Sequence, residues 1–414
     1  MYKLFSCCVQ VGMILILASL GGNNARAEDW PQWRGVHRDA VSHETGLLQE
    51  WSKEGPRQAW KATGLGRAYS SVAVAGGRIF TMGDLEAPDK GEAVIALQAS
   101  GGKKIWSSKV GEPWSDGGPR CTPTVDGDRV YALSPHGDLV CFTTAAGKEL
   151  WRKNLDKDFG GHMMSSWGYS ESPLVDGDKL ICTPGGKEAT LVALDKKTGK
   201  EIWKCQVPGG DGAAYSSVIA ADIDGQRQYV QFLGGGVVGV AAKDGKFLWR
   251  YDKPANGTAN CATPIVHDHF VFASSDYGTG GALAKIVQGS QAEVVYATKS
   301  MKNHHGGMVL VDGYLYGANS GNLACLDFET GKVMWDESKA GKGSIAYADG
   351  MLYYRGEGGK MLLVEANPKK YVERGRFDQP DRKGSPAWSH PALANGKLYL
   401  RDQDVLLCYD IKKK

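Results

Sequence analysis

The sequence has no marked excess of charge of either sign. Its 49 basic and 46 acidic side chains leave a formal net charge of +3 over 414 residues. A near-neutral chain offers no electrostatic attraction for the phosphates of nucleic acids or for acidic lipids. We therefore expect no nucleic-acid partner and no attachment to a membrane through charge.

The N-terminal apolar run is too short to cross a bilayer. Residues 9–20 form a mainly apolar stretch of 12 residues, whereas a membrane-spanning helix needs about 20. The run follows Lys3 and precedes Ala25-Arg26-Ala27, which has the A-x-A pattern of a signal-peptide cleavage site. We interpret residues 1–27 as a signal peptide and residues 28–414 as one exported domain without a transmembrane segment. A membrane anchor that stays on the protein is the alternative.

Cysteine offers no disulfide framework. Nine cysteines occur, and Cys7 and Cys8 fall within the predicted signal peptide, so an odd number remains in the mature chain. Cys141, Cys325 and Cys408 occupy positions at which matching segments carry alanine. We expect these cysteines to be small buried side chains, while oxidation of a well-placed pair stays open for an exported protein.

The chain also lacks the short motifs of common enzymes. No Ser-His-Asp order, phosphate-binding loop or Cys-x-x-Cys pair occurs, so we assign no catalytic residue. The candidates for a zinc or copper site are the adjacent histidines His304 and His305, with His162 or His390 as a further ligand. Adjacent side chains on a strand point to opposite faces, so we predict no metal site there.

What the chain does contain is a repeat. The string Gly-Lys-x-x-Trp occurs five times, ending at Trp106, Trp151, Trp203, Trp249 and Trp335. The first four tryptophans are 45, 52 and 46 residues apart, and the last follows after 86, which is two periods with one tryptophan missing. A period of roughly 40–50 residues is typical of one four-stranded propeller blade.

Each period also contains a hairpin signal ahead of the Gly-Lys pair. Asp-Gly or Asn-Gly turns flanked by alternating apolar residues occur at 126–127, 176–177, 312–313, 349–350 and 395–396, with diverged versions near residues 76, 224 and 268. Such dipeptides favour the tight turns of β-hairpins. Eight hairpins predict an all-β, eight-bladed β-propeller with four-stranded blades, and the 56 glycines fit a chain dense in turns.

The last repeat stops before its fourth strand. Residues 406–410 form a third strand, and the chain then ends without a further Gly-Lys-x-x-Trp. Pro56–Trp60 precedes the first hairpin and has no hairpin of its own. We predict that this N-terminal strand completes the eighth blade, which closes the ring and removes an open sheet edge.

These motifs resemble those of a known family. The pattern Ala-x-Asp-x-x-Thr-Gly-x-x-x-Trp, complete at residues 193–203, resembles the tryptophan-docking repeat of eight-bladed pyrroloquinoline-quinone (PQQ) propellers. The resemblance covers roughly residues 59–410. Residues 29–35, Asp-Trp-Pro-Gln-Trp-Arg-Gly, look like the start of exported bacterial PQQ-like repeat proteins whose activities are mostly unassigned. The family includes quinoprotein alcohol dehydrogenases and a non-catalytic lipoprotein subunit of the outer-membrane β-barrel assembly machine.

Candidate ligand-binding residues lie where the inner strands begin, just ahead of the hairpin signals. Polar and aromatic groups that converge on one concavity are typical of a ligand site, and a water-filled channel mouth is the other interpretation. The candidates are Arg67, Arg120, Trp167, Glu171, Asn260, Asn303, His304 and Trp388.

The resemblance also allows a test for quinoprotein chemistry. It implies that Glu171 and Asn260 stand where a calcium ion is held beside PQQ, and that the catalytic base falls near Asn303. Asparagine cannot accept a proton as a base does. The adjacent cysteines that cover the quinone in those dehydrogenases are absent from the mature chain.

The sequence therefore favours a binding protein over an enzyme. We expect a monomeric, periplasmic or secreted propeller without a cofactor. Its partner would be an envelope protein, or a polymer or small ligand at the channel face. The alternative is an alcohol or sugar dehydrogenase that uses PQQ with calcium.

The docking tryptophans predict a stability difference. Replacing Trp203 with alanine should lower the free energy of unfolding by about 3–5 kcal/mol, because a large buried aromatic ring is deleted. The same change at Trp167 or Trp388 should lower it far less, because we expect these rings to face the channel. Urea denaturation measures all three variants, and equal losses would contradict the assignment.

Overall fold

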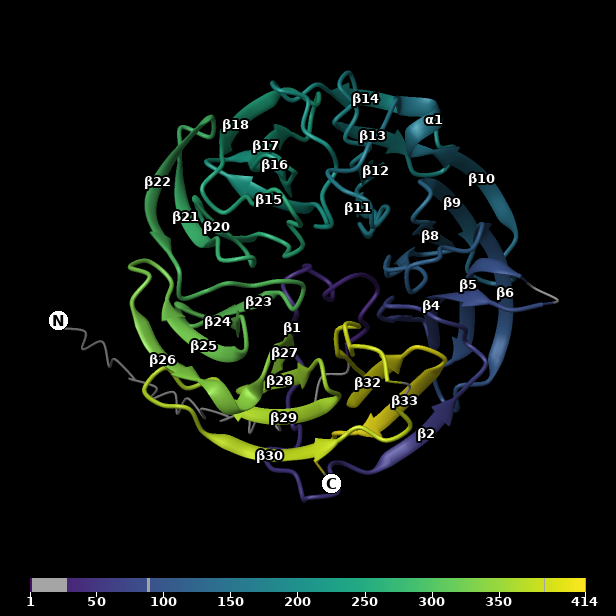
Figure 1. Cartoon of the computed structure of the whole chain (residues 1–414), viewed down its shortest axis with the longest axis vertical. Coiled ribbons are helices and arrows are strands. Elements are labelled where there is room, and N and C mark those ends of the chain that lie inside the picture. The colour runs from purple at the N-terminus through teal and green to yellow at the C-terminus, as the bar shows by residue number, and fades with distance from the viewer. Residues whose placement is uncertain (2–27, 88–89, 383, 414) are drawn as a thin grey trace.

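The computed structural model describes residues 1, 28–87, 90–382 and 384–413, which form a ring of blades around one axis (Figure 1). In these residues, eight sheets of at least four strands follow one another along the chain. The predicted eight-bladed β-propeller is therefore confirmed. The predicted signal peptide lies outside the described residues, and within them no helix has the length and apolar character needed to span a membrane.

The first four blades each consist of four consecutive antiparallel strands. Blades one and two contain β3 Ala73–Ala75, β4 Arg78–Leu85, β5 Gly91–Gln98, β6 Lys104–Gly111, β7 Thr124–Asp126, β8 Arg129–Leu133, β9 Asp138–Thr143 and β10 Glu149–Asn154. Blades three and four contain β11 Leu174–Asp176, β12 Lys179–Cys182, β13 Leu191–Asp195, β14 Glu201–Cys205, β15 Ile219–Ile223, β16 Gln226–Phe232, β17 Val237–Ala241 and β18 Phe247–Tyr251. The short helix α1, Leu155–Phe159, follows β10.

The remaining blades continue the pattern until the last, which ends one strand short. Blades five and six contain β19 Ile265–His267, β20 Phe270–Ser275, β21 Gly280–Val287, β22 Gln291–Thr298, β23 Met308–Val311, β24 Tyr314–Asn319, β25 Asn322–Asp327 and β26 Val333–Glu337. Blades seven and eight contain β27 Gly343–Ala348, β28 Met351–Gly356, β29 Lys360–Glu365, β30 Glu373–Asp378, β31 Ala392–Ala394, β32 Lys397–Asp402 and β33 Val405–Asp410. A 3₁₀ turn, Ser338–Ala340, follows β26.

The ring closes through the N-terminal strand β2, Gln58–Ala62. This strand pairs antiparallel with β33 and is the outer strand of blade eight, with Trp60 opposite Cys408. The predicted closure is confirmed. It ties the two ends of the folded chain into one sheet and leaves no unpaired outer edge on β33.

The repeated tryptophans join each blade to the next. The Trp106 indole N–H donates to the Thr144 carbonyl oxygen at 3.0 Å, and the Trp151 indole N–H donates to the Lys196 carbonyl oxygen at 3.1 Å. The missing tryptophan of blade five is replaced by Tyr296, whose hydroxyl donates to the Phe328 carbonyl oxygen in blade six at 2.8 Å. Trp249 departs from this pattern, because its indole N–H donates to Gln228 of its own blade.

The glycine of each Gly-Lys-x-x-Trp string receives the aromatic ring of the preceding blade. Gly147 has φ +67° and a Cβ there would lie 2.5 Å from the Trp106 ring, while at Gly199, with φ +70°, it would lie 2.8 Å from the Trp151 ring. Both the backbone conformation and the close contact exclude larger residues. The repeat motif therefore encodes the contact between blades.

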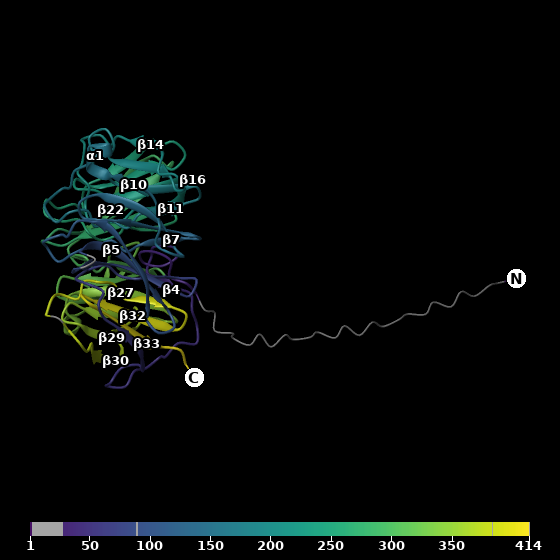
Figure 2. The same cartoon turned by 90° about the vertical axis from the view of Figure 1, so that its right-hand side faces the viewer.

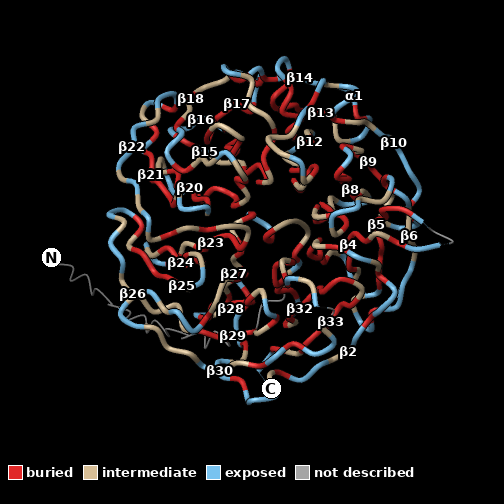
Figure 3. Tube along the Cα trace, in the orientation of Figure 1, coloured by how far each residue is buried: buried red, intermediate tan, exposed pale blue. Residues whose placement is uncertain are grey.

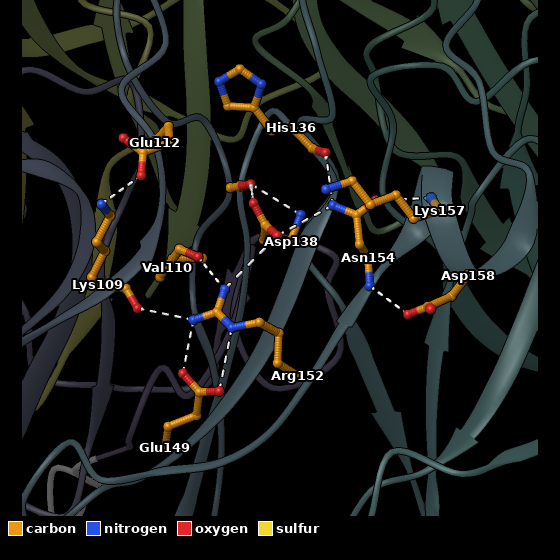
Figure 4. A network of polar contacts seen from close by, with 11 residues as sticks. Lys109, Val110, Glu112, His136, Asp138, Glu149, Arg152, Asn154, Lys157 and Asp158 are labelled. Atoms are coloured by element: carbon orange, nitrogen blue, oxygen red, sulfur yellow. Dashed lines mark hydrogen bonds and ion pairs between the residues drawn. The ribbon is translucent and has the colours of Figure 1, made fainter.

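A polar network at the rim also connects blades one and two (Figure 4). The Arg152 guanidinium on β10 donates to the Val110 and Lys109 carbonyl oxygens of β6 and pairs with Glu149 at 2.8 Å. Asn154 donates to Asp138 at 3.2 Å and caps α1. Exposed ion pairs of this kind contribute little each, so the apolar packing between blades supplies most of the stability.

The core lies in the middle strands of the blades, and the outer strands face solvent (Figure 3). Strand β9 has four consecutive buried residues, whereas β10 has none. All seven cysteines in the described part of the chain are free, and six are buried, among them Cys141, Cys325 and Cys408. The expectation of small buried cysteines is therefore confirmed.

Residues 28–42 enter the central channel, which the sequence did not predict. We call this segment the channel plug; its purple trace crosses the middle of the ring in Figure 1, and Figure 2 shows the ring from the side. The plug ends in β1, Val41–Ser42, which pairs parallel with β27 as a fifth strand of blade seven. It contacts every blade of the ring.

Arg38 is the most deeply buried anchor of the plug. Its guanidinium donates to the carbonyl oxygens of Ser172 and Pro173 from blade three and to that of Val218 from blade four. It also reaches the Thr124 hydroxyl of blade two at 3.4 Å. Burial lowers the pKa of Arg38 to about 10, which leaves the side chain charged at neutral pH.

Other plug residues bind the remaining blades. The Arg34 guanidinium donates to the Met308 carbonyl oxygen of blade six, and the Trp33 indole N–H donates to the Thr263 hydroxyl of blade five at 3.0 Å. Backbone hydrogen bonds join the plug to blades one, two, seven and eight. The pairs are Trp30 with Val74, Pro31 with Val125, Ala40 with Tyr347, and Glu28 with Asn395.

If Arg38 anchors the plug in the channel, its loss should destabilise the protein. Arg38→Met should lower the free energy of unfolding by about 3–5 kcal/mol, because it removes a buried charge whose acceptor carbonyls then lose their partner. Lys53→Met, an exposed change just after the plug, should alter it by less than about 0.5 kcal/mol. Urea unfolding measures both, and equal stability of the two variants would show that Arg38 does not anchor the plug.

Candidate functional site

A pocket of about 240 Å³ lies at the propeller axis, and we call it the axial pocket. Its walls are formed by the loops that lead into the inner strands. Among the described residues, seven of the eight blades contribute, through Tyr69, Arg120, Trp167, Tyr215, Cys261, His304 and Trp388.

The channel plug supplies the floor of the axial pocket. Trp33 of the plug packs against His390, with ring centroids 4.4 Å apart, and both residues line the pocket. The His390 Nε2 lies 2.7 Å from the His305 carbonyl oxygen. Because the plug fills the axis beneath these rings, the channel becomes a pocket with a closed end.

One wall is a continuous series of aromatic rings. Tyr69 and Trp388 have centroids 4.6 Å apart, and the His305 ring lies 5.2 Å from Trp388. The Arg120 guanidinium lies 5.6 Å from the centre of the Tyr69 ring, which is within the range of a cation–π contact. Such a wall suits a flat or apolar group that enters from solvent.

Arg120 is held in place by its own loop and by the next blade. It donates to the Trp167 carbonyl oxygen at 3.1 Å and to the Asp116 carboxylate at 3.2 Å. Its side chain is 14% exposed, and the Asp116 carboxylate that pairs with it also lines the pocket. Trp167 packs edge-on to Tyr215 on the same side, with centroids 5.7 Å apart.

His304 and His305 lie together, which corrects the expectation that they point to opposite faces. They occupy a bend ahead of β23 rather than a strand, and their Nδ1 atoms are 3.2 Å apart. The Tyr277 hydroxyl lies 3.1 Å from the His304 Nε2. The alternation rule fails here because it holds only for extended backbone.

Burial keeps the pocket histidines uncharged. It lowers the pKa of His304 to about 4 and that of His390 to about 3, and it lowers the pKa of His305 well below its ordinary value. The nearby positive charges of Lys342, for His304 and His305, and of Arg34, for His390, act in the same direction. Near neutral pH all three imidazoles are therefore neutral.

Four of the eight residues predicted from sequence line the axial pocket: Arg120, Trp167, His304 and Trp388. The other four do not. Glu171, Asn260 and Asn303 are buried in the pocket wall with at most 1% exposure. Arg67 pairs with Asp84 at 3.0 Å and lines a separate, larger hollow of about 1010 Å³.

Glu171 serves the fold rather than the pocket. Its carboxylate accepts from the Thr183 backbone N–H at 2.8 Å and from the Thr183 hydroxyl at 3.1 Å. Burial raises the pKa of Glu171 to about 7, and the nearby Arg38 charge and the Thr183 bonds oppose this rise. When ionised, the side chain is a counter-charge to Arg38, the anchor of the channel plug.

The two asparagines bind backbone groups of their own and neighbouring loops. Asn260 accepts from the Asn256 N–H at 3.0 Å and donates to the Leu233 carbonyl oxygen at 3.0 Å. Asn303 accepts from the Gly307 N–H at 2.9 Å and donates back to the Gly307 carbonyl oxygen at 2.8 Å. Their polar atoms are engaged within the wall.

Sequence reasoning missed several residues of the axial pocket. Tyr69 and Tyr215 are each followed by two serines ahead of a hairpin, and this shared offset was a usable signal. Tyr277 comes from the loop between β20 and β21, and Trp33 comes from the plug. No local pattern connects these two with the axis.

The eight-bladed fold and its repeated tryptophans define a PQQ-like propeller. The profile of the family described as outer membrane protein assembly factor BamB matches residues 89–337. This match covers more than half of the chain, so the protein belongs to that family. BamB of Shewanella oneidensis is 23% identical over 327 residues, which cover 74% of this chain and 75% of the relative.

Solved structures share the fold. BamB from Moraxella catarrhalis matches with a TM-score of 0.59 at 15% identity, over 83% of this chain and 94% of that chain. Quinohemoprotein alcohol dehydrogenase from Comamonas testosteroni matches with a TM-score of 0.66 at 12% identity, over 95% of this chain and 82% of that chain. At such identities the likeness concerns architecture alone.

The residues present do not fit a calcium-bound quinone. The candidate calcium ligands Glu171 and Asn260 do not line the axial pocket, and their oxygens already accept hydrogen bonds inside the wall. A hard cation needs several such oxygens turned toward it. The pocket instead presents imidazoles, indoles and one guanidinium, and its carboxylate, that of Asp116, is paired with this guanidinium.

Asn303 gives a prediction that separates a structural role from a catalytic one. Asn303→Asp should lower the free energy of unfolding by about 1–3 kcal/mol, because a buried carboxylate would replace the amide N–H that the Gly307 and Ala318 carbonyl oxygens accept. Asn322→Asp is the matched control on the partly exposed start of β25. Guanidinium denaturation compares them, and an Asn303→Asp variant as stable as the control would contradict the structural role.

Proposed function

We propose that this protein is an exported, non-catalytic binding protein of the cell envelope. Residues 1–27 would be removed as a signal peptide, and residues 28–414 would act as a monomeric propeller in the periplasm or outside the cell. The N-terminal sequence pattern and membership of the BamB family support this location. The relatives are named as outer membrane protein assembly factors, which favours a protein partner.

The observation that carries the proposal is the chemistry of the axial pocket. Aromatic rings and one fixed guanidinium converge on it, as in a binding site. The residues that would hold calcium for quinone chemistry are turned into the wall and bonded there. The site therefore favours recognition over redox catalysis.

The size of the axial pocket favours an inserted side chain as its occupant. Its volume of about 240 Å³ is below the roughly 300–1,000 Å³ of typical small-molecule sites. We infer that a short segment of another envelope protein inserts an aromatic or apolar side chain between Trp388 and Tyr215. Tyr277, 51% exposed at the rim, would be among the first residues to meet it.

Site-specific photo-crosslinking in the native host tests this role. A benzoylphenylalanine at Tyr277 should form an adduct with an envelope protein, and Trp388→Ala in the same chain should abolish it. The control is the same probe at Ile202, which is 42% exposed on the outer rim. Adducts that are equal at both positions, or that survive Trp388→Ala, would contradict binding at the axial pocket.

The second candidate is the PQQ-dependent dehydrogenase, because indole rings also line the axis. Purified protein mixed with PQQ and calcium should retain no quinone absorbance after gel filtration and should reduce no dye with an alcohol or sugar. Retention of quinone with dye reduction would establish the enzyme instead.

A further inference from the structure

A group of metal-ligand side chains lies at the edge of the axial pocket. Within residues 28–87, 90–382 and 384–413, His304, His305 and Glu357 form the one group of three whose donor atoms all lie within 4.8 Å of one another. The two histidines precede β23 in blade six, and Glu357 follows β28 in blade seven. The group therefore joins two blades at the mouth of the channel.

The spacings within this group suit a single small ion. One donor atom from each of the three residues can be chosen so that all three lie within 4.8 Å of one another. An imidazole gives one nitrogen to one ion, and the His305 Nε2, which lies 3.6 Å from the Glu357 Oε1, is the nitrogen that faces the carboxylate. Two ligands on a tetrahedral ion with bonds of about 2.0–2.1 Å are separated by roughly 3.3 Å. The His305 Nε2 is buried and has no hydrogen-bond partner, so a donor atom is left unused in the group.

Neighbouring residues orient the three side chains. The Tyr277 hydroxyl lies 3.1 Å from the His304 Nε2, which leaves the Nδ1 of that ring turned toward His305. The Trp388 indole N–H donates to the Glu357 Oε1 at 2.7 Å. Partners of this kind, which fix ring and carboxylate orientation, are typical of metal sites.

The donor set indicates which class of ion would bind. Two imidazoles and one carboxylate are the ligands of zinc sites that keep a fourth position open, whereas calcium prefers six to eight oxygens. Both histidines and Trp388 also line the axial pocket, so the fourth position would face its interior.

We propose that His304, His305 and Glu357 bind a zinc-type divalent transition-metal ion, with an open coordination position directed into the axial pocket. This site goes beyond the binding role proposed above and does not depend on it. A donor group that enters the pocket would complete the coordination in place of water.

Lys342 is the present counter-charge of Glu357. Its ammonium lies 3.5 Å from the Glu357 Oε1, and the side chain is 28% exposed. A bound cation would displace it toward solvent along its flexible stem. Lys342→Met should therefore tighten metal binding, whereas a merely structural cluster would show no metal affinity to tighten.

Calorimetric titration of the chelator-treated mature chain with zinc chloride alone tests the site. We expect one equivalent to bind and no comparable binding of calcium. His304→Ala and Glu357→Gln should each weaken zinc binding by more than about tenfold, because even the loss of an outer partner costs 10–100-fold. Zinc should raise the melting temperature of the wild type and leave that of His304→Ala unchanged.

Two further variants test whether zinc binds at this site and not at another histidine pair. His37→Ala is the control, because His37 and His43 form another histidine pair with centroids 6.0 Å apart, and zinc binding should be unaffected. Lys342→Met should bind zinc more tightly. Absence of zinc binding to the wild type, or stoichiometric binding that survives His304→Ala and Glu357→Gln, would overturn the proposal.

Discussion

The buried guanidinium of Arg38 is the interaction on which the arrangement of the channel depends. An eight-bladed ring leaves an axis that its own strands do not fill, and here a charged side chain ties blades two, three and four together across it. Such a group is stable in the interior only when its N–H groups are bonded. Carbonyl oxygens just ahead of the inner strands β11 and β15 supply these bonds.

The plug converts a channel into a pocket. Because residues 28–42 contact every blade, one end of the axis is sealed and Trp33 becomes the floor beneath His390. Tyr69, Trp388 and the two adjacent histidines then form walls around a closed end. A binding site therefore arises from the folding of the N-terminal segment together with the ring.

Much of the fold could be predicted because it repeats. The Gly-Lys-x-x-Trp motifs form the contacts between neighbouring blades, so their spacing indicated the number of blades. The strand that contains Trp60 has no hairpin of its own, and this indicated the strand that closes the ring. The plug could not be predicted, since Arg38 meets Val218 across 180 residues and no local pattern records that contact. Within the plug, residues 29–35 were noticed for their likeness to related chains, and Arg38 lies outside that stretch.

The position of the candidate site could be predicted from the sequence, but only some of its residues could. Counting back from each hairpin located the ring of inner-strand starts, and Arg120, Trp167, His304 and Trp388 do face the axis. Glu171 occupies the same ring and faces the wall, because neighbouring residues on extended backbone point in opposite directions. His304 and His305 were expected to point in opposite directions, but a bend in the backbone brings their rings together, and the sequence did not reveal this bend.

BamB and a quinohemoprotein alcohol dehydrogenase share this architecture. In this chain the oxygens of Glu171 and Asn260 bond to the wall, while imidazole and indole groups face the pocket. The channel plug seals the axis and creates that pocket. Hydrogen exchange of the backbone amides measured by mass spectrometry tests this sealing most directly. Peptides covering residues 30–41 should exchange as slowly as those of the inner strands β3 and β27. Complete exchange of residues 30–41 within seconds, while the blades remain protected, would show that the plug does not fill the channel.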